Sequence, residues 1–267
     1  MVYLRRVVRH RAAFSLLIAT SSCGAPVSDE PHAPLVSYDG KNRVLRFDGA
    51  ADYATTGTAA FPFPTDPQTV VLWVRVADAT PPAGDSGAAD GLQTLVALRK
   101  DFDSGLTLGL RDGAFEVWSA YNKRTFARAA VPPKKGVWQY IAYTFDGSVH
   151  RLYVDGQPAG EGQVSPSNRT PTTAWLGSVD GSSAFFAGDM DEVRVYTVAL
   201  SSSTILAQAA KGRARDTSID QRDALVLWLG FDEVSGFRAL DRSARSNDAL
   251  LGDGIAAHAP ERLIEDP

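Results

Sequence analysis

Short runs of alternating hydrophobic and polar residues recur along most of the chain. From Val70 to Val76, the apolar residues Val70, Leu72, Val74 and Val76 occupy alternate positions, which is the period of a strand with one buried face. Further short apolar runs occupy residues 44–47, 92–98, 106–110, 114–121, 138–145, 150–154, 175–177, 190–196 and 225–229. Turn residues separate these runs at intervals of roughly ten residues, a pattern typical of β-sandwiches and jelly rolls. The pattern therefore predicts an all-β fold.

Two tight turns and one helix complete this outline. The Asp-Gly sequences at 146–147 and 155–156 each follow a strand-like run, and such sequences are strong hairpin signals. The helix is expected to begin after Ser201 or Ser202, either of which can cap its N-terminus, and to end before Gly212.

The N-terminal residues have the pattern of an export signal. Four arginines and no acidic residue lie in residues 1–22, together with an apolar run that is too short to span a bilayer. Three small residues then precede Cys23, the one cysteine of the chain, which cannot form an internal disulfide. We therefore expect a signal peptide over residues 1–22 and a polar tether over residues 23–38.

The residues before that cysteine resemble a bacterial lipobox, in which the cysteine becomes the lipidated N-terminus of the mature protein. The sequence departs from the common pattern at Thr20, where leucine is usual. The resemblance implies an exported lipoprotein that Cys23 anchors to the cell envelope, at the outer membrane or the cell surface. Such a protein contacts the membrane through its lipid only. The alternative is an ordinary signal peptide with a coincidental cysteine, which would give a secreted protein.

Charge narrows the range of partners. The chain carries 27 Lys and Arg against 31 Asp and Glu, a net charge of −4. Four of the arginines lie in the expected signal peptide, so the remainder carries 23 basic against 31 acidic side chains, a net charge of −8. Nucleic-acid binding depends on Lys and Arg that neutralise phosphates. We therefore expect no nucleic-acid partner.

An ordered set of short motifs resembles a known superfamily. The matching segments, in chain order, are Leu45–Gly49, Asp52-Tyr53, Val70–Val74, Gly136–Gly147, Leu152–Gly156, Gly188–Tyr196 and Ala199–Ser201. Together they resemble the concanavalin A-like lectins and glucanases, and in particular bacterial laminin-G-like modules. The resemblance implies a two-sheet antiparallel β-sandwich, or jelly roll, over residues 39–212.

The C-terminal residues 213–267 contain one further family-like segment. Leu225–Glu233 and the polar loop that comes after it resemble the strand and loop that normally precede the Phe-Asp-Gly strand in this family. Here they come after the domain instead. The segment either completes the same sandwich in permuted order, which we favour because such an apolar strand needs a sheet to pair with, or opens a truncated second module.

The resemblance also includes glucanases, which use two carboxylates in a cleft, one as nucleophile and one as acid. The nearest approach is Asp189, Asp191 and Glu192. Strand alternation puts Asp189 and Asp191 on one face and Glu192 on the other, and it puts Asp191 on the face of Val193 and Val195. The four histidines are scattered and fit neither a catalytic triad nor a zinc site. We therefore expect no enzymatic activity, with a divergent glycoside hydrolase as the less favoured alternative.

Asp191 needs a partner if it lies on an apolar face, because an unpaired buried charge is costly. The resemblance implies that such a carboxylate can bind Ca²⁺ at a sheet rim, and Asp48 at the end of the first strand is then its expected companion. Ca²⁺ would be a structural cofactor. In the alternative, Asp191 accepts hydrogen bonds from backbone N–H groups of a neighbouring turn.

Aromatic side chains beside polar ones are the other candidate site. Sugar-binding sites combine a flat aromatic platform with amide and charged groups. The candidate ligand-binding residues are Trp118, Tyr121, Asn122, Lys123, Trp73 and Arg75. Three further tryptophans are expected to fill the core, namely Trp138, Trp175 and Trp228.

These observations predict a non-catalytic, lectin-like surface module. Its partner is expected to be a glycan or a surface protein, because the family resemblance comes with aromatic candidates and without a catalytic carboxylate pair. A structural or adhesion component of the cell envelope without a small ligand is the alternative.

Overall fold

A computed structural model describes residues 37–62, 64–78, 91–100, 105–119, 122–163, 171–213 and 221–265. Within these residues the chain forms two antiparallel sheets of eight strands each, so the predicted all-β sandwich is confirmed. The expected signal peptide with Cys23 lies outside the described residues, as does Tyr121. None of the helices in the described part is both long and apolar enough to cross a membrane.

Sheet A forms one layer of the sandwich. Its spatial order is β10 (Gln157–Gly162), β9 (His150–Val154), β8 (Trp138–Phe145), β3 (Gln68–Val76), β12 (Ala187–Tyr196), β1 (Arg43–Asp48) and β16 (Glu261–Ile264). The eighth strand, β13 (Leu225–Leu229), pairs with β12 beside this path.

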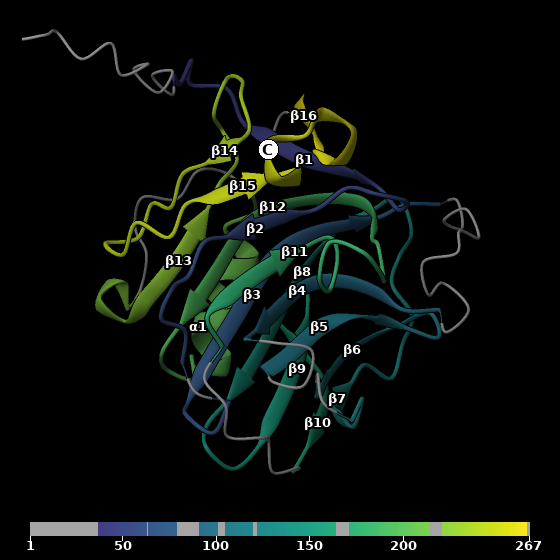
Figure 1. Cartoon of the computed structure of the whole chain (residues 1–267). Coiled ribbons are helices and arrows are strands. Elements are labelled where there is room, and N and C mark those ends of the chain that lie inside the picture. The colour runs from purple at the N-terminus through teal and green to yellow at the C-terminus, as the bar shows by residue number, and fades with distance from the viewer. Residues whose placement is uncertain are drawn as a thin grey trace, which may run out of the picture. The chain divides into compact units, whose positions relative to one another are not determined.

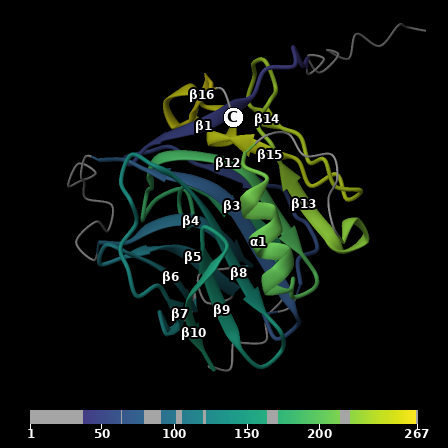
Figure 2. The same cartoon turned by 180° about the vertical axis from the view of Figure 1, so that it is seen from behind.

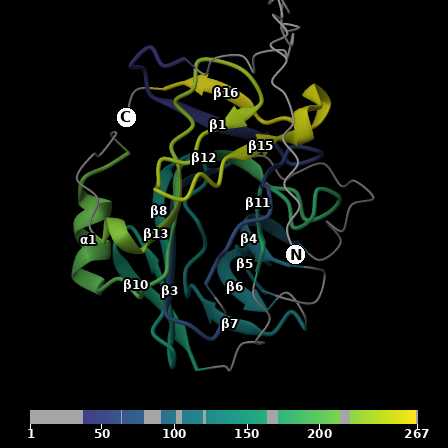
Figure 3. The same ribbon diagram turned by 60° about the vertical axis from the view of Figure 1, so that its left-hand side comes forward.

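Sheet B forms the other layer (Figure 3). Its spatial order is β14 (Arg238–Ala239), β15 (Ala249–Leu251), β2 (Ala54–Thr56), β11 (Thr173–Leu176), β4 (Gln93–Arg99), β5 (Gly105–Arg111), β6 (Ala114–Ser119) and β7 (Thr125–Arg128). The described residues also include three short 3₁₀ helices, namely η2 (Arg222–Ala224), η3 (Gly252–Gly254) and η4 (Ala256–His258).

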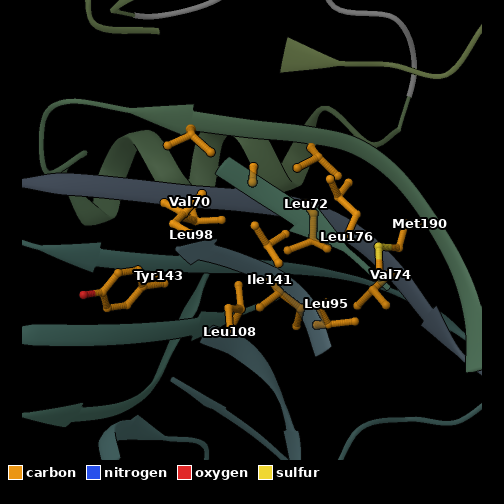
Figure 4. Close-up of a cluster of buried hydrophobic side chains, with 14 of the residues drawn as sticks. Val70, Leu72, Val74, Leu95, Leu98, Leu108, Ile141, Tyr143, Leu176 and Met190 are labelled. Carbon is orange, nitrogen blue, oxygen red and sulfur yellow. The ribbon is translucent and has the colours of Figure 1, made fainter. Parts of the chain in front are cut away.

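The core lies between the sheets and is built from alternate positions of their strands. On β3, Val70, Leu72 and Val74 are fully buried in this core, as the sequence alternation predicts. Leu98 and Leu108 of sheet B belong to the same cluster (Figure 4). Burying such a side chain contributes about 1.5–3 kcal/mol, so this apolar layer is the main source of stability.

The helix α1 (Ser202–Ala210) covers part of the outer face of sheet A (Figure 2). Ser201 caps it, because its side chain accepts a hydrogen bond from the backbone N–H of Thr204 at 3.1 Å. Ile205 packs with Tyr140 and Tyr196 in a second hydrophobic cluster on that outer face. The outer face of sheet A is therefore largely a packing surface.

At one side of the sandwich β7 and β10 come close enough to join the sheets. The backbone N–H of Ala130 donates to the carbonyl of Ala159 at 3.1 Å. A Cβ placed on Gly160 would lie 1.9 Å from the Arg128 carbonyl oxygen, and one on Gly162 would lie 2.1 Å from that of Phe126. Only glycine allows this approach of two backbones.

The C-terminal segment contributes strands to both sheets. β13 pairs with β12 and β16 pairs with β1 in sheet A, while β15 pairs with β2 in sheet B. In Figure 1 the yellow strand β16 lies beside the purple strand β1. Residues far apart in sequence therefore complete one double-layered structure.

None of the five tryptophans belongs to the hydrophobic cluster between the sheets. Trp228 is buried as predicted, but in the second cluster, on the outer face of sheet A. The prediction that Trp138 and Trp175 fill the core is wrong, because both are half-buried and belong to neither cluster. The alternate positions on the same strands fill the space between the sheets instead, with Ala174 and Leu176 on β11 and Ile141, Tyr143 and Phe145 on β8.

Candidate functional site

One row of outward-facing residues crosses all eight strands of sheet B. Directly paired residues of neighbouring strands lie on the same face of a sheet. From β14 to β7 the paired residues are Arg238, Leu250, Thr55, Trp175, Ala97, Thr107, Trp118 and Thr125. We call this set the transverse row. Its face is the outer one, because Ala174 and Leu176, on either side of Trp175, belong to the core.

Exposure changes along the transverse row. Arg238 is exposed, and the next three members up to Trp175 are half-buried. Ala97 and Thr107 are fully buried, and Trp118 is 4% exposed. Trp175 and Trp118 stand three strands apart, a separation of about 14 Å at ordinary strand spacing. The row is therefore accessible from β14 to β11, enclosed from β4 to β6, and exposed again at Thr125 on β7.

Trp175 belongs to a small aromatic group at the open part of the row. Its ring centre lies 5.7 Å from that of Tyr53, at an interplanar angle of 44°. The Tyr53 hydroxyl donates to the Asp253 carboxylate at 3.0 Å, and the ring of His258 lies 6.1 Å from that of Tyr53. These contacts fix Trp175 from one side while it stays half-buried.

Trp118 lies flat against the sheet at the enclosed end. A Cβ on Gly109 would come within 2.9 Å of the indole atom Cη2, so the ring occupies the space that a side chain would fill. The guanidinium of Arg111 lies 4.8 Å from the ring centre, within the range of a cation–π contact. Trp118, a candidate ligand-binding residue from the sequence, is therefore almost fully enclosed.

Glu116 lies next to Trp118 and is fixed by hydrogen bonds on both oxygens. One oxygen accepts from Arg111 and Thr125, each at 2.7 Å, and the other accepts from Arg128 at 2.5 Å. Among the described strand residues that face outward from sheet B, Glu116 is the one carboxylate. Glycoside hydrolysis by the usual route needs two carboxyl groups, so this face has no catalytic pair among those residues.

Three buried polar atoms near Trp118 have no hydrogen-bond partner in the part of the chain that the structure describes. They are Oγ1 of Thr94, Oγ1 of Thr107 and Nη2 of Arg111. Thr94 and Thr107 lie on the outer face of sheet B, and Thr107 is paired directly with Trp118. Leaving such an atom unpaired costs about 1–3 kcal/mol. Sequence alone does not single out these residues, because a threonine on a strand carries no functional signal until the sheet register is known.

Asn122 and Lys123 form the exposed turn between β6 and β7. The Asn122 side chain accepts a hydrogen bond from the backbone N–H of Arg124 at 3.1 Å, and Lys123 has a positive φ of 53°. Asn122 therefore shapes the turn through its side chain. Both residues come soon after Trp118 in the sequence, so the structure places them beside the enclosed end of the transverse row.

Trp73 and Arg75 lie on the outer face of the other sheet. The ring of Trp73 packs 5.3 Å from that of Tyr140. Arg75 pairs with Asp189 and with Glu265, at 2.6 and 2.7 Å. The structure therefore does not bring this pair together with Trp118.

The sequence interpretation of Asp191 is wrong in one respect, because the residue does not share a face with Val193 and Val195. The register of β12 against β3 shifts directly after Asp191, and Glu192 has a φ of 51°. This irregularity is a β-bulge, which inserts one extra residue and reverses the facing of the residues after it. Val193 and Val195 face the core.

Asp191 is nevertheless fully buried, and its partners are protein groups. Its carboxylate accepts from the backbone N–H of Glu192 at 2.8 Å, from Asn42 at 3.3 Å and from Arg213 at 3.4 Å. Burial, together with the smaller effect of the charge of Glu192, raises the pKa of Asp191 well above its ordinary value. The predicted backbone acceptor role is therefore present, with two side-chain donors added.

Asp48 and Asp191 are not neighbours. Asp48 is paired with Ala187 on β12, four residues away from Asp191, which corresponds to about 13 Å along a strand. The carboxylate of Asp48 instead accepts from the backbone N–H groups of Ala50 and Ala51, at 2.8 and 2.9 Å. No group of three His, Cys, Asp or Glu suited to a metal ion occurs among the described residues.

The other acidic candidates on β12 are also engaged with arginines. Asp189 pairs with Arg46 at 2.8 Å as well as with Arg75. Glu192 pairs with Arg194 and accepts a hydrogen bond from the indole N–H of Trp228 at 2.8 Å. Each carboxylate therefore has a structural partner.

Comparisons with solved structures agree with this fold. A candidate carbohydrate-binding protein from Bacteroides ovatus superposes with a TM-score of 0.57 at 17% identity, over 88% of this chain and 62% of that one. The chain thus spans less than two thirds of that protein. A heptameric SAP-like pentraxin from Limulus polyphemus superposes with a TM-score of 0.50 at 12% identity, over 67% of this chain and 87% of the pentraxin. No curated protein matches the chain significantly.

A comparison with protein families identifies the group to which the sequence belongs. Residues 48–206 match the Laminin_G_3 family, described as the concanavalin A-like lectin/glucanases superfamily. The match covers more than half of the 267 residues. The chain is therefore a member of the concanavalin A-like lectin/glucanase superfamily and contains a Laminin_G_3 domain.

Proposed function

We propose that the protein is a non-catalytic carbohydrate-binding module that holds a glycan on the transverse row of sheet B. The observation that carries this proposal is the position of Trp175 and Trp118 in one row, with the unpartnered hydroxyl of Thr107 between them. Aromatic rings stack on the apolar faces of sugars, and buried hydroxyls orient their hydroxyl groups. The description of the Bacteroides ovatus protein as a candidate carbohydrate-binding protein agrees with this role.

The two parts of the transverse row have different roles, sugar stacking at Trp175 and hydrogen bonding near Trp118. The half-buried Trp175 is the platform that a sugar ring reaches first, because Tyr53 already holds it in place. Thr107 and Arg111 at the enclosed end have polar atoms without partners, so a ligand hydroxyl that pairs with them removes a desolvation cost. Hydrogen bonds to the ligand at this end would select among sugars, because the polar groups of the site stay unpaired when the wrong sugar binds.

The proposal is tested on a glycan array, and then by titration calorimetry with the best-bound soluble oligosaccharide. We expect Trp175→Ala to weaken binding by about tenfold or more, which corresponds to the loss of one stacking contact. Thr107→Val keeps the side-chain shape and removes the hydroxyl, so it should also weaken binding. The matched controls are Trp138→Ala and Thr144→Val on sheet A, which should leave the affinity unchanged. An array without any bound glycan, or equal losses in variants and controls, would overturn the proposal.

The absence of catalysis is part of the proposal. Glu116 is held by two arginines and a threonine, and it has no second carboxylate beside it on the described outer face of sheet B. We expect no release of reducing sugar from any glycan that the protein binds. Turnover that disappears in Glu116→Gln or Asp189→Asn would contradict this expectation.

We propose further that the protein is exported and that Cys23 carries a lipid anchor to the cell envelope. The support is the order of an arginine-rich start, a short apolar run and small residues before the one cysteine. Expressed in a bacterium, the full chain should partition into the detergent phase of Triton X-114. Cys23→Ala should move it to the aqueous phase, and partitioning that the substitution does not change would exclude the anchor.

A further inference from the structure

A groove lies where two paired strands of sheet B separate. The pairing of β2 with β15 ends at Thr56 and Ala249. Beyond this pair, residues 57–62 run along the neighbouring segment, because the backbone N–H of Ala59 donates to the carbonyl of Thr172 at 2.7 Å. Residues 241–248 turn instead towards β13, where Asp241 bridges to Leu229. The space between the two segments, which we call the fork groove, has a volume of about 490 Å³.

The walls of the fork groove combine apolar and polar groups. Its apolar residues are Ala59, Ala60, Phe61, Pro62 and Val226, and its polar residues are Thr58, Asp66, Thr197, Arg245 and Asn247. Small-molecule sites in proteins typically have this size and a mostly apolar lining with a few convergent polar groups. The fork groove therefore has the size of a small-molecule site, with apolar and polar residues in equal number along its walls.

The loop that forms one wall is held in place by its own hydrogen bonds. The carboxylate of Asp241 accepts from the backbone N–H groups of Trp228 and Ser243, at 2.8 and 2.9 Å, and from that of Asn247 at 2.8 Å. The Asn247 side chain donates to the carbonyl of Val226 at 2.7 Å. A wall that is already ordered loses little conformational entropy on binding.

The fork groove leads directly into the transverse row. An adjoining hollow of about 350 Å³ shares Thr58 and Asn247 with it and is also lined by Leu250 and Arg238. These last two residues are the first members of the transverse row. The distance from β15 to Trp118 on β6 is five strand spacings, about 24 Å. An accessible surface therefore runs from the fork groove to Trp175, and the enclosed Trp118 lies three strands beyond it.

We propose that the fork groove is a second saccharide-binding subsite, so that the module takes an extended, uncharged polysaccharide chain across its strands and not a single terminal sugar. This inference rests on the proposed function of the transverse row. The groove and the adjoining hollow are lined by two carboxylates, Asp66 and Asp248, and two guanidinium groups, Arg238 and Arg245. Because these charges balance, the surface suits a neutral ligand with many hydroxyl groups.

The test compares affinity with chain length. Neutral glucan, xylan, mannan, arabinan and galactan fragments, from disaccharides to octasaccharides, are titrated by calorimetry. For the class of polysaccharide that binds, affinity should rise with fragment length until the fragment reaches both subsites. Ala60→Trp fills the fork groove from an exposed position without removing a hydrogen-bonding side chain. It should reduce the affinity for long fragments by about tenfold and leave that for disaccharides unchanged.

The control is Ala207→Trp, an exposed position on α1 that should change neither affinity. If fragments bind in a Trp175-dependent manner but neither length nor Ala60→Trp has an effect, the fork groove is not a subsite and the proposed function stands. If no neutral fragment binds but the array shows a charged glycan, the inference fails and the proposed function stands; if the array is also silent, both fail. If Ala60→Trp weakens disaccharides as strongly as octasaccharides, the two hollows are one small site and the extended-chain inference is wrong.

Discussion

At the level of single residues, the alternation of side chains along a strand decides whether an aromatic ring packs in the core or faces outward, where it can bind a ligand. Ala174 and Leu176 face the core, so Trp175 between them must face outward. The same rule puts Trp118 outward beside Val117. Hydrophobicity alone leads to the opposite expectation for Trp175, because a large apolar residue is usually assigned to the core.

Asp52 makes the stability of the protein depend on pH. Burial, and then the charge of Asp48, raises the pKa of Asp52 to about 6 from 3.8. The folded state therefore binds this proton more tightly than the unfolded state. The stabilisation from Asp52 is complete below about pH 4 and is lost as the pH rises through 6.

Asp52→Asn should therefore be more stable than the parent protein at pH 8 and should lose this advantage at pH 4. Its side-chain oxygen can still accept the hydrogen bond from the backbone N–H of Asp48. We expect a gain on the order of 1 kcal/mol, about 2–4 °C in Tm, because solvent screening reduces the full effect. Thermal melts across the pH range measure it.

Asp146→Asn is the control with the opposite sign. The hydrogen bond from Arg151 lowers the pKa of Asp146 to about 2, so its stabilisation is present near neutral pH and is lost in acid. This variant should melt at a lower temperature than the parent protein at pH 8. A gain in stability in both variants would show that general charge repulsion, and not the site of each carboxylate, governs the effect.

The contacts of Asp191 and Asp48 predict how the stability of the protein responds to Ca²⁺. The Asp191 carboxylate already accepts hydrogen bonds from three protein donors, including Arg213. Asp48 lies about 13 Å from Asp191, and its carboxylate accepts hydrogen bonds from the turn that follows it. A cation bound only to the folded state must raise Tm. We expect no rise with millimolar Ca²⁺, measured by differential scanning calorimetry against Mg²⁺ and EDTA. A clear rise specific to Ca²⁺ would restore the predicted structural site.

Among the elements, β12 and β13 show most clearly what sequence periodicity can and cannot predict. The bulge at Glu192 has no sequence signature, because the positive φ of 51° falls on an ordinary residue and not on glycine. Simple alternation from Asp189 onward therefore fails after Asp191. The apolar run of β13, in contrast, predicts a strand correctly, and the structure pairs it with β12.

If β13 is an integral part of the sandwich, shortening one of its core side chains must be costly. Leu227 is fully buried between the sheets, so Leu227→Ala should destabilise the fold by about 2–5 kcal/mol. Thermal melts should show a fall in Tm of roughly 4–20 °C. The control is Leu206→Ala on α1, where the parent side chain is 45% exposed. Equal, small effects in both variants would mean that the C-terminal segment is dispensable.

For the whole molecule, the fold is predictable from the sequence but the site is predictable only in part. Motif order and strand alternation are sufficient for the two-sheet architecture. The transverse row depends on the register of strands far apart in the chain, such as β6, β11 and β15. Register depends on packing and turn geometry across the whole sheet, so a single sequence cannot bring Trp118, Trp175 and Leu250 together. Trp118 is nevertheless recognisable as a candidate, because it lies on a strand beside polar residues.

The central claim is that sheet B, and not sheet A, binds a glycan, and the tryptophan indoles report on it directly. Two of the five tryptophans face outward from sheet B, and the other three lie on sheet A. ¹H–¹⁵N spectra resolve each indole N–H, and Trp→Phe variants assign them. During titration with the best-bound oligosaccharide, we predict that the signals of Trp175 and Trp118 shift while those of Trp73, Trp138 and Trp228 stay in place. Shifts confined to the three sheet A indoles would contradict the account.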